Sequence, residues 1–575
     1  MITNTILTKA KFRIMCGIWA VFGVAKDLAY HCHCASQIAH RGPDSFRMES
    51  IPGFDNCYLA FFRLAIVGNS CGMQPLHISS LPHIHVMYNG EIYNYKKLAE
   101  KYGFDCQTGS DGEVILHLYA KFGVKETAEL LDGVFAFIIV DTAKGEVHFG
   151  RDTFGIRPLF MLKSDEGRCY GVCSEMKGLV QMKKDLKEDQ TTTIDHVLPG
   201  HYCSLSLQTN GKSRIVEASP YTSITKIPAF DTDVKLESDV EANVRSYLME
   251  AVRKRLMGNR RVGCLLSGGL DSSLVTALAV KFMREQGSPF PVQTFCIGME
   301  GSIDLKAARK VAHYLGTEHH EIPFRADEAI KQISTVIKHL EGYDNSTIRG
   351  SVCMFLVCKY IRENTDTVVL LSGEGADELA QGYRYFEHAP SAKDADEESK
   401  RLLRNIYFYD VLRVDRCTAA HGLEVRVPML DKAFTSYYLS LPAEMRQPRQ
   451  GKEKFLLRSS FQKGELIPEE VLWRKKEPMS AGVSPVREGA SWFDVLRNHF
   501  SKTVAEDEMV TASSKYPFNT PKSKQAYFYR KTFEGYFPGE HHATPRMWTL
   551  KWMAFEDPSV KTIEHRDNRE QVTTN

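Results

Sequence analysis

The stretch Arg261-Val-Gly-Cys-Leu-Leu-Ser-Gly-Gly-Leu-Asp-Ser-Ser-Leu-Val275 decides how the second half of this 575-residue chain folds. Its apolar run Val262–Leu266 predicts a short buried strand, Ser267-Gly268-Gly269 a tight turn, and Asp271–Glu285 a helix. Glycines let backbone N–H groups approach a phosphate closely, and the N-terminus of a helix adds partial positive charge. The stretch lacks the Gly-x-x-x-x-Gly-Lys-Ser/Thr pattern of the ordinary nucleotide P-loop, so it predicts a phosphate site of another kind.

Strands and helices continue to alternate after this stretch. Strands are predicted at Val292–Gly298, Glu318–Phe324 and Thr367–Leu371, and helices at Leu305–Leu315, Asp327–Leu340 and Ser351–Glu363. This alternation is typical of an α/β doubly wound sheet that is mostly parallel. Ligands bind such sheets at the carboxyl ends of their strands. The glycine-rich segment Ser372-Gly-Glu-Gly-Ala-Asp-Glu378 follows the last strand, so we expect it to face the turn at Ser267.

The first half of the chain has a different pattern. Short strands are predicted around Ile18–Phe22 and at Leu59–Val67, His83–Tyr88, Gly133–Asp141 and Glu146–Gly150, with one clear helix at Gly112–Phe122. Strand-rich sequence with few helices favours an α+β sandwich of stacked antiparallel sheets. The length requires more than one domain.

The composition is that of an ordinary globular protein. Hydrophobic residues make up 43% of the chain and charged residues 25%, and 73 basic against 71 acidic side chains leave a net charge of +2. This balance gives no argument for a nucleic-acid or membrane partner. The fourteen cysteines have no framework spacing, which is typical of reduced thiols in the cytoplasm. His31-Cys-His-Cys34 resembles a metal motif, but ligands so close together cannot easily complete a tetrahedron.

Cys16 is the first candidate for catalysis. If the chain begins at Cys16, this residue carries both a thiol and an α-amine of pKa about 7.7–8.0, so nucleophile and base share one residue. Residues 1–15 are then a leader, either removed or lying upstream of a true start at Met15; a transit peptide is the other interpretation. If the leader stays attached, Cys16 has no free α-amine to act as this base.

Six short segments of the first half of the chain, beginning at Met15, occur in a characteristic order. They are Met15-Cys-Gly-Ile18, Ala39-His-Arg-Gly-Pro-Asp44, Phe62-Arg-Leu-Ala-Ile66, Tyr88-Asn-Gly-Glu-Ile-Tyr-Asn94, Gly109-Ser-Asp-Gly112 and Gly150-Arg-Asp-Thr-Phe-Gly-Ile-Arg-Pro-Leu159. Together they closely resemble the class II glutamine amidotransferase domain, an N-terminal-nucleophile fold. The resemblance implies that Cys16 attacks the side-chain amide of glutamine, and that Asn89 and Gly90 form the oxyanion hole. It also implies a glutamine-binding set of Arg63 for the α-carboxylate, Asp111 for the α-ammonium, and Asn89, Gly90 and Glu91.

Ser267-Gly-Gly-Leu-Asp-Ser272 matches the signature of the PP-loop ATP pyrophosphatases, which adenylate an oxygen and release pyrophosphate. Leu340-Glu-Gly-Tyr-Asp-Asn-Ser-Thr-Ile-Arg349, His421-Gly-Leu-Glu-Val-Arg-Val-Pro-Met-Leu-Asp431 and Glu453-Lys-Phe-Leu-Leu-Arg458 further resemble the glutamine-hydrolysing asparagine synthetases. By that resemblance ATP, a substrate, and its pyrophosphate are held by Leu265, Ser267, Gly268, Gly269, Asp271, Ser272, Ile297, Ser372 and Gly373. Glu374 and Lys454 are catalytic, Thr347 and Arg349 bind aspartate, and Asp271 and Asp377 supply the carboxylates that Mg²⁺ prefers.

The resemblance implies a division into five segments. They are the leader 1–15, an amidotransferase domain 16–205, a connection 206–239 that includes an edge strand, a synthetase domain 240–556, and a polar tail 557–575. The expected partners are glutamine, aspartate and ATP, and both a monomer and a homodimer stay open. Two alternatives also remain: a related ligase of β-lactam-synthetase type, which would not need Cys16, and a catalytically silent copy that binds a partner.

Overall fold

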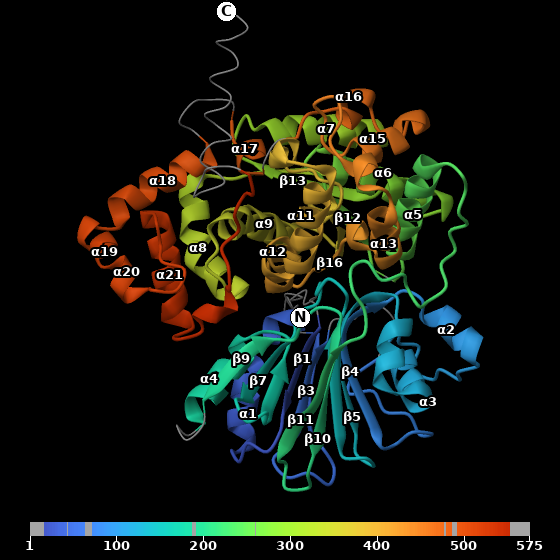
Figure 1. Ribbon diagram of the computed structural model, residues 1–575, viewed down its shortest axis with the longest axis vertical. Helices are drawn as coiled ribbons and strands as arrows, with labels where there is room; N and C mark the ends of the chain where they lie inside the picture. The colour runs from blue at the N-terminus through green and yellow to red at the C-terminus, as the bar shows by residue number, and fades with distance from the viewer. Residues whose placement is uncertain are drawn as a thin grey trace, which may run out of the picture.

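The computed structural model describes residues 16–42, 44–63, 72–186, 191–258, 260–476, 479–485 and 491–552. The predicted leader at 1–15 and tail at 557–575 lie outside the described residues. Figure 1 shows two bodies, with the antiparallel sheets in the lower one and the helix-rich parallel sheet in the upper one. The fold class predicted from the sequence, an α+β sandwich followed by an α/β doubly wound sheet, is confirmed.

Two stacked antiparallel sheets form the lower domain. The first has the order β2-β3-β1-β8-β7-β9 and the second β11-β10-β6-β5-β4. The strands are β1 (Gly17–Val21), β2 (Ser45–Ser50), β3 (Tyr58–Arg63), β4 (Ile84–Ile92), β5 (Gly133–Asp141), β6 (Glu146–Arg151), β7 (Phe160–Ser164), β8 (Cys169–Cys173), β9 (Thr192–His196), β10 (His201–Leu207) and β11 (Ser213–Pro220). The helices are α1 (Leu28–Ser36), η1 (Ala39–Arg41), α2 (Tyr95–Tyr102), α3 (Glu113–Leu130) and α4 (Lys177–Asp185).

The core of this domain follows from the two-residue period of its strands. On β1, Ile18 and Ala20 pack into the layer between the sheets, whereas Trp19 and Val21 belong to the cluster that includes side chains of α1 and α4. All four side chains are fully buried. The central strand is therefore covered on both faces, which fixes the position of Cys16 directly before it.

Several predicted boundaries shift. β4 continues to Ile92 instead of ending at Tyr88, because Asn89, Gly90 and Glu91 stay paired with β5. α3 continues to Leu130 past a kink at Gly123, whose φ of 77° no regular helix allows. β3 ends at Arg63, and the remainder of the predicted strand, 64–67, lies outside the described residues. β11 pairs with β10, so the second sheet extends into the stretch 206–239.

The upper domain is built on five parallel strands in the order β14-β13-β12-β15-β16. They are β12 (Val262–Leu265), β13 (Gln293–Gly298), β14 (Glu318–Pro323), β15 (Val369–Leu371) and β16 (Glu424–Arg426). The helices that precede or alternate with them are α5 (Val240–Lys254), α6 (Leu270–Glu285), α7 (Ile303–Leu315), α8 (Ala326–Leu340) and α9 (Asn345–Asn364). α9 begins six residues before its predicted start at Ser351, because Asp344 caps it by accepting the Thr347 N–H.

The remaining helices complete the upper domain. They are α10 (Ala376–Leu379), η2 (Arg384–His388), α11 (Ala392–Asn405), η3 (Ile406–Phe408), α12 (Asp410–Ala420), η4 (Pro428–Leu430), α13 (Lys432–Ser440), α14 (Ala443–Arg446), α15 (Phe455–Ser460), η5 (Gln462–Gly464), α16 (Glu469–Leu472), α17 (Met479–Gly482), α18 (Trp492–Thr503), α19 (Glu506–Val510), α20 (Ala512–Lys515), α21 (Lys524–Tyr536) and η6 (His541–Ala543). Within the described parts of the chain, no helix combines the length and apolar character needed to cross a membrane.

A buried set of ion pairs joins the two domains. The Arg41 guanidinium lies 2.6 Å from Glu175 of its own domain and 2.9 Å from Asp415 on α12. Arg157 likewise lies 3.3 Å from Glu424 on β16. Because removing one partner leaves a buried charge uncompensated, at a cost of about 3–5 kcal/mol, these pairs strongly favour one relative placement of the domains.

Candidate active sites

The lower site surrounds Cys16. The residue is half-buried, and its backbone carbonyl accepts a hydrogen bond of 3.2 Å from the Arg41 guanidinium. A small cavity beside it is lined by Cys16, Phe61, Arg63, Gly72, Gln74, Tyr88, Asn89, Gly90, Glu91, Ser110, Asp111 and Glu424. All the glutamine-site residues predicted from the sequence therefore lie around one cavity.

Asn89 and Gly90 suit an oxyanion hole. The Asn89 amide nitrogen is buried and has no hydrogen-bond partner among the described residues. Leaving such a donor unsatisfied costs about 1–3 kcal/mol, which a ligand oxygen would recover. Gly90 has a φ of 137°, and a Cβ there would lie 1.8 Å from the Val134 carbonyl oxygen. Only glycine therefore fits at this position of β4.

Asp111 and Arg63 lie buried on the same cavity wall. The Asp111 carboxylate accepts hydrogen bonds from the Tyr88 hydroxyl at 2.6 Å and the Ile92 N–H at 2.7 Å. Burial raises the pKa of Asp111 to about 6, although these hydrogen bonds act in the opposite direction. A Cβ on Gly72 would lie 3.1 Å from the Arg63 guanidinium, so there is little room for a side chain at position 72.

Glu91 connects the lower site to the upper domain. Its carboxylate lies 3.4 Å from the Arg426 guanidinium on β16, and Glu424 of the same strand lines the cavity. Burial raises the pKa of Glu91 well above its usual range, and the nearby Glu424 and Asp111 carboxylates act in the same direction. The upper domain thus supplies part of the wall of the lower site, which the sequence motifs did not indicate.

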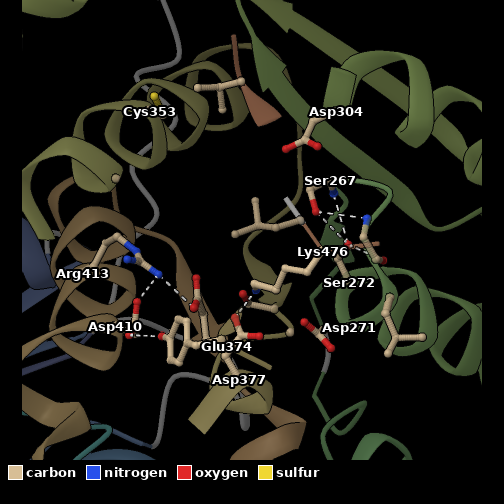
Figure 2. A pocket seen from close by; sticks show the side chains of 18 of the residues that line it. Ser267, Asp271, Ser272, Asp304, Cys353, Glu374, Asp377, Asp410, Arg413 and Lys476 are labelled. Carbon is tan, nitrogen blue, oxygen red and sulfur yellow. Dashed lines mark hydrogen bonds and ion pairs between the residues drawn. The ribbon is translucent and has the colours of Figure 1, made fainter. Parts of the chain in front are cut away.

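The upper site is a cavity of about 510 Å³ at the carboxyl ends of β12, β13 and β15. That volume is in the range of small-molecule sites. The predicted residues that line it are Leu265, Ser267, Gly269, Asp271, Ser272, Ile297, Thr347, Arg349, Ser372, Gly373, Glu374, Asp377 and Lys454. Figure 2 shows the turn at Ser267 and Ser272 on one side of this cavity and Glu374 with Arg413 on the other.

The turn after β12 is held by its own hydroxyls. The Ser272 hydroxyl accepts the Ser267 N–H at 3.2 Å, and the Ser267 hydroxyl accepts the Gly269 N–H at 3.4 Å. Gly269 starts α6 without a side-chain cap, so the first amide groups of that helix remain to bind an anion.

Gly268 and Gly373 allow close approach of backbones. Gly268, predicted to contact phosphate, does not line the cavity. A Cβ on it would lie 2.5 Å from backbone atoms of Ala307 and Ala308 on α7, and its carbonyl accepts a hydrogen bond from Arg474. Gly268 therefore shapes the turn by packing against α7 and not by lining the cavity. A Cβ on Gly373 would lie 2.8 Å from Asp271 Cβ, so the two glycine-rich loops touch at this point.

Two lysines and two aspartates face one another in the cavity. Lys454, only 1% exposed, contacts Asp271 and lies 2.6 Å from Asp377, which also pairs with Lys476. Burial opposes ionisation of Asp377, but the two lysines outweigh it and hold the pKa of its carboxyl well below the usual range. One Asp271 oxygen, Oδ1, is buried without a hydrogen-bond partner among the described residues. A carboxylate oxygen without a hydrogen-bond partner fits a hard cation such as Mg²⁺, which prefers oxygen ligands.

Glu374 lies across the cavity from the phosphate turn. Its carboxylate is 2.9 Å from the Arg413 guanidinium, which also lies 2.5 Å from Asp410. Burial raises the pKa of Glu374, and Arg413 only partly offsets this effect. A carboxyl group with a raised pKa is a stronger base than an ordinary glutamate.

The first turn of α9 brings Thr347 and Arg349 to the cavity. The Thr347 hydroxyl donates to Asp344 at 2.8 Å, and the Arg349 guanidinium stacks on Phe493 at 4.8 Å. Both side chains are held by their neighbours in positions from which they line the cavity wall. Leu265 and Ile297, from β12 and β13, form part of its apolar lining.

Several charged residues of the upper cavity were not predicted as site residues from the sequence. Asp304, Asp410, Arg413 and Lys476 are among them. Lys476 occurs in Trp473-Arg-Lys-Lys476, a basic run that usually marks a solvated surface. Its pairing with Asp377 crosses 99 residues, so no local pattern indicated it.

The comparisons with known proteins agree with this arrangement. Residues 15–227 match the family described as a glutamine amidotransferase domain, and residues 243–402 and 387–557 match the family described as asparagine synthase. Fold and sites therefore define the class, a glutamine amidotransferase joined to a synthetase.

Full-length relatives specify the family further. The asparagine synthetase [glutamine-hydrolyzing] of Gallus gallus is 51% identical over 559 residues, and that of Homo sapiens is 50% identical over 559 residues. Each alignment covers 96% of this chain and 99% of the relative. This chain belongs to the family of glutamine-hydrolysing asparagine synthetases.

Proposed function

We propose that this protein makes L-asparagine from L-aspartate, with ATP as energy source and glutamine as nitrogen donor. ATP and aspartate react to β-aspartyl-AMP and pyrophosphate, and ammonia then displaces AMP. The observation that carries this proposal is the connection of the two sites by one three-residue strand, β16. Glu424 at its start lines the lower cavity, and the carbonyl of Arg426 at its end accepts the N–H of Ser372 in the upper cavity at 3.0 Å.

At the lower site, the Cys16 thiol gives its proton to the α-amine of the same residue and attacks the amide carbon of glutamine. The Asn89 amide and the Gly90 N–H stabilise the oxyanion that forms on the former carbonyl. Ammonia leaves, and water hydrolyses the thioester to glutamate. Arg63 and Asp111 bind the α-carboxylate and α-ammonium groups of glutamine and fix its orientation.

Ammonia then passes inside the protein to the upper site. Support comes from β16, along which Glu424 and Arg426 are about 7 Å apart at the usual rise of a strand. Both side chains are at least 97% buried. An internal route keeps ammonia away from water, in which most of it would be protonated and no longer nucleophilic.

At the upper site, the turn at Ser267–Ser272 and the N-terminus of α6 bind the β,γ-pyrophosphate group, while Leu265 and Ile297 flank the adenine. Ser372 and Gly373 contact the nucleotide, and Thr347 and Arg349 hold aspartate. Lys454 and Lys476 stabilise the negative charge that develops as pyrophosphate leaves, a role that their contacts with Asp271 and Asp377 support. Glu374 accepts a proton from the attacking ammonia, a role that its raised pKa supports.

Asp271 and Asp377 would hold Mg²⁺ that arrives with ATP. The ion would neutralise phosphate charge and orient the leaving pyrophosphate. The buried Asp271 oxygen without a hydrogen-bond partner in the described structure supports this assignment.

The proposed division of the chain assigns glutamine hydrolysis to residues 16–205 and synthesis to residues 240–556, with 206–239 as the connection. A cytoplasmic location is supported by the thirteen described cysteines, none of which forms a disulfide.

The reaction can be tested with protein that begins at Cys16. Incubation with ATP, aspartate and glutamine should yield AMP, asparagine and glutamate in equal amounts. A Cys16→Ala variant should make asparagine only from added ammonia. Absence of AMP formation with either nitrogen donor would disprove the proposal, and AMP formation with another carboxylate but not aspartate would redirect it to a related ligase.

A further inference from the structure

Three metal-ligating side chains converge on the lower domain, away from both active sites. Glu49 lies on β2, His85 on β4, and His77 in the connection that crosses from β3 to β4. β2 is the edge strand of the six-stranded sheet, and β4 is the edge strand of the five-stranded sheet. The three side chains therefore meet where the edge strands of the two stacked sheets approach each other, next to the bridge that Leu76 of the connection forms with Val86 of β4.

The spacing of the donor atoms suits a small cation. His77 Nε2 lies 2.9 Å and His85 Nδ1 3.9 Å from the same oxygen of Glu49, Oε1. All three donor atoms lie within 4.8 Å of one another. Ligands around a tetrahedral Zn²⁺, with bonds of about 2.0–2.2 Å, are about 3.3–3.5 Å apart. The two measured distances lie on either side of this value, so small side-chain shifts would bring the atoms to coordination distance.

Two of the three side chains, His85 and Glu49, lie on paired strands, whereas the third, His77, is accessible to solvent. His85 is 6% exposed and paired through its backbone with Val140 of β5, while Glu49 is paired with Leu59 of β3. The His77 side chain is 38% exposed, which leaves a path for an ion to enter.

A second cluster, Cys106, Glu113 and His117, differs in one decisive respect. The Glu113 carboxylate already accepts the N–H groups of Gln107 and Thr108, each at 2.7 Å. It also accepts the Thr108 hydroxyl at 2.7 Å. This glutamate stabilises the turn before α3, and its oxygens are not available to a metal ion. Glu49 has no such backbone donors among the hydrogen bonds of the described residues. Its Oε1 atom faces the two imidazoles, and its other oxygen, Oε2, lies 3.5 Å from the Arg47 guanidinium.

We propose that Glu49, His77 and His85 form a binding site for Zn²⁺ or a similar divalent transition-metal ion. Two imidazoles and one carboxylate are a ligand set that zinc prefers, and the fourth position is left for water. The ion would join the edges of the two sheets and hold the connection between residues 72 and 83 in place. That connection also carries Gly72 and Gln74 to the glutamine cavity, where the Gln74 side chain accepts the Tyr88 N–H at 2.6 Å.

The test measures Zn²⁺ binding to metal-free full-length protein in competition with a chromophoric chelator. The variants are His77→Ala and Glu49→Gln, and the matched control is His83→Ala, which removes an imidazole from the same connection outside the cluster. Wild type and His83→Ala should bind one more equivalent of Zn²⁺ than the other two variants, or bind it at least about tenfold more tightly. Zn²⁺ should raise the Tm of wild type and His83→Ala by more than it raises the Tm of His77→Ala and Glu49→Gln.

Co²⁺ distinguishes this site from adventitious binding at cysteine. Co²⁺ bound by nitrogen and oxygen ligands gives visible d–d bands without the intense thiolate-to-metal charge-transfer band in the near ultraviolet. These bands should be present in wild type and His83→Ala and absent in His77→Ala. Equal Zn²⁺ affinity in all four proteins, no Zn²⁺ binding by wild type, or a cobalt spectrum dominated by thiolate would each overturn the proposal.

Discussion

Truncation of Asn89 to alanine should separate catalysis from stability. The Asn89 amide nitrogen is buried and makes no hydrogen bond within the described structure, so its removal breaks none. The unfolding free energy should change by less than about 1 kcal/mol, because relief of an unsatisfied donor offsets the lost packing. Glutamine hydrolysis should lose about 10²–10³ in kcat, equivalent to about 2.7–4 kcal/mol, as for removal of one oxyanion-hole donor.

Asn94 offers a matched control two residues beyond the end of β4. It is also buried, but its amide donates to the Leu130 carbonyl at 2.9 Å and accepts the Asp132 N–H at 3.0 Å. Asn94→Ala should therefore lower the unfolding free energy by about 1–3 kcal/mol. It should leave glutamine turnover of the folded protein within a few-fold of wild type, since neither partner lies on the cavity wall.

The assay follows glutamate release by protein that begins at Cys16, together with AMP formation from free ammonia and denaturant unfolding. Asn89→Ala should retain ammonia-dependent synthesis. The assignment of Asn89 to the oxyanion hole would be refuted by glutamine hydrolysis within about threefold of wild type. A parallel loss of ammonia-dependent synthesis would refute the separation of the two sites.

Three further predictions concern both sites. Burial raises the pKa of Asp111 to about 6, so its carboxyl loses charge as pH falls through 6. The value of kcat/KM for glutamine should therefore drop about tenfold from pH 7 to pH 5. A flat pH profile would contradict the binding of the glutamine α-ammonium group by Asp111. Lys454→Met should lower synthesis from either nitrogen donor by at least about 10²-fold and leave glutamate release intact, so an equal loss of both would indicate misfolding. Gly373→Ala places a Cβ 2.8 Å from Asp271 Cβ, and KM for ATP should rise by about tenfold or more; an unchanged KM in initial-rate assays would show that the loops can separate.

Local patterns were sufficient where structure depends on neighbours in sequence. The strand, turn and helix around Ser267 were predicted to within one residue, because the apolar period, the glycines and the helix start are all local features. The carboxyl-end rule for parallel sheets then predicted that Ser372 and Ser267 lie at the same edge of the sheet. Boundaries were less predictable: β4 runs past Asn89-Gly90 because pairing with β5 outweighs the turn preference of that dipeptide.

Tertiary structure alone decided which charges meet. Lys476 pairs with Asp377 from 99 residues away, and Glu424 reaches the glutamine cavity from the other domain. Lysine and glutamate are mostly solvated surface residues, so neither position was distinguishable in the sequence. The metal ligands show the same contrast: His31-Cys-His-Cys34 has adjacent candidates that lie along one helix, whereas Glu49, His77 and His85 meet only through sheet stacking.

For this protein, the sequence by itself determined the two kinds of sheet and the strand, turn and helix around Ser267–Ser272, because short stretches with a strong local preference specify them; it also predicted Cys16 as the nucleophile. The tertiary structure decided that the amidotransferase and synthetase sites share β16, and that buried pairs such as Arg41 with Asp415 hold them together. Those contacts bridge up to 374 residues of chain. They depend on the burial of opposite charges between folded domains, a property that no single stretch of sequence possesses.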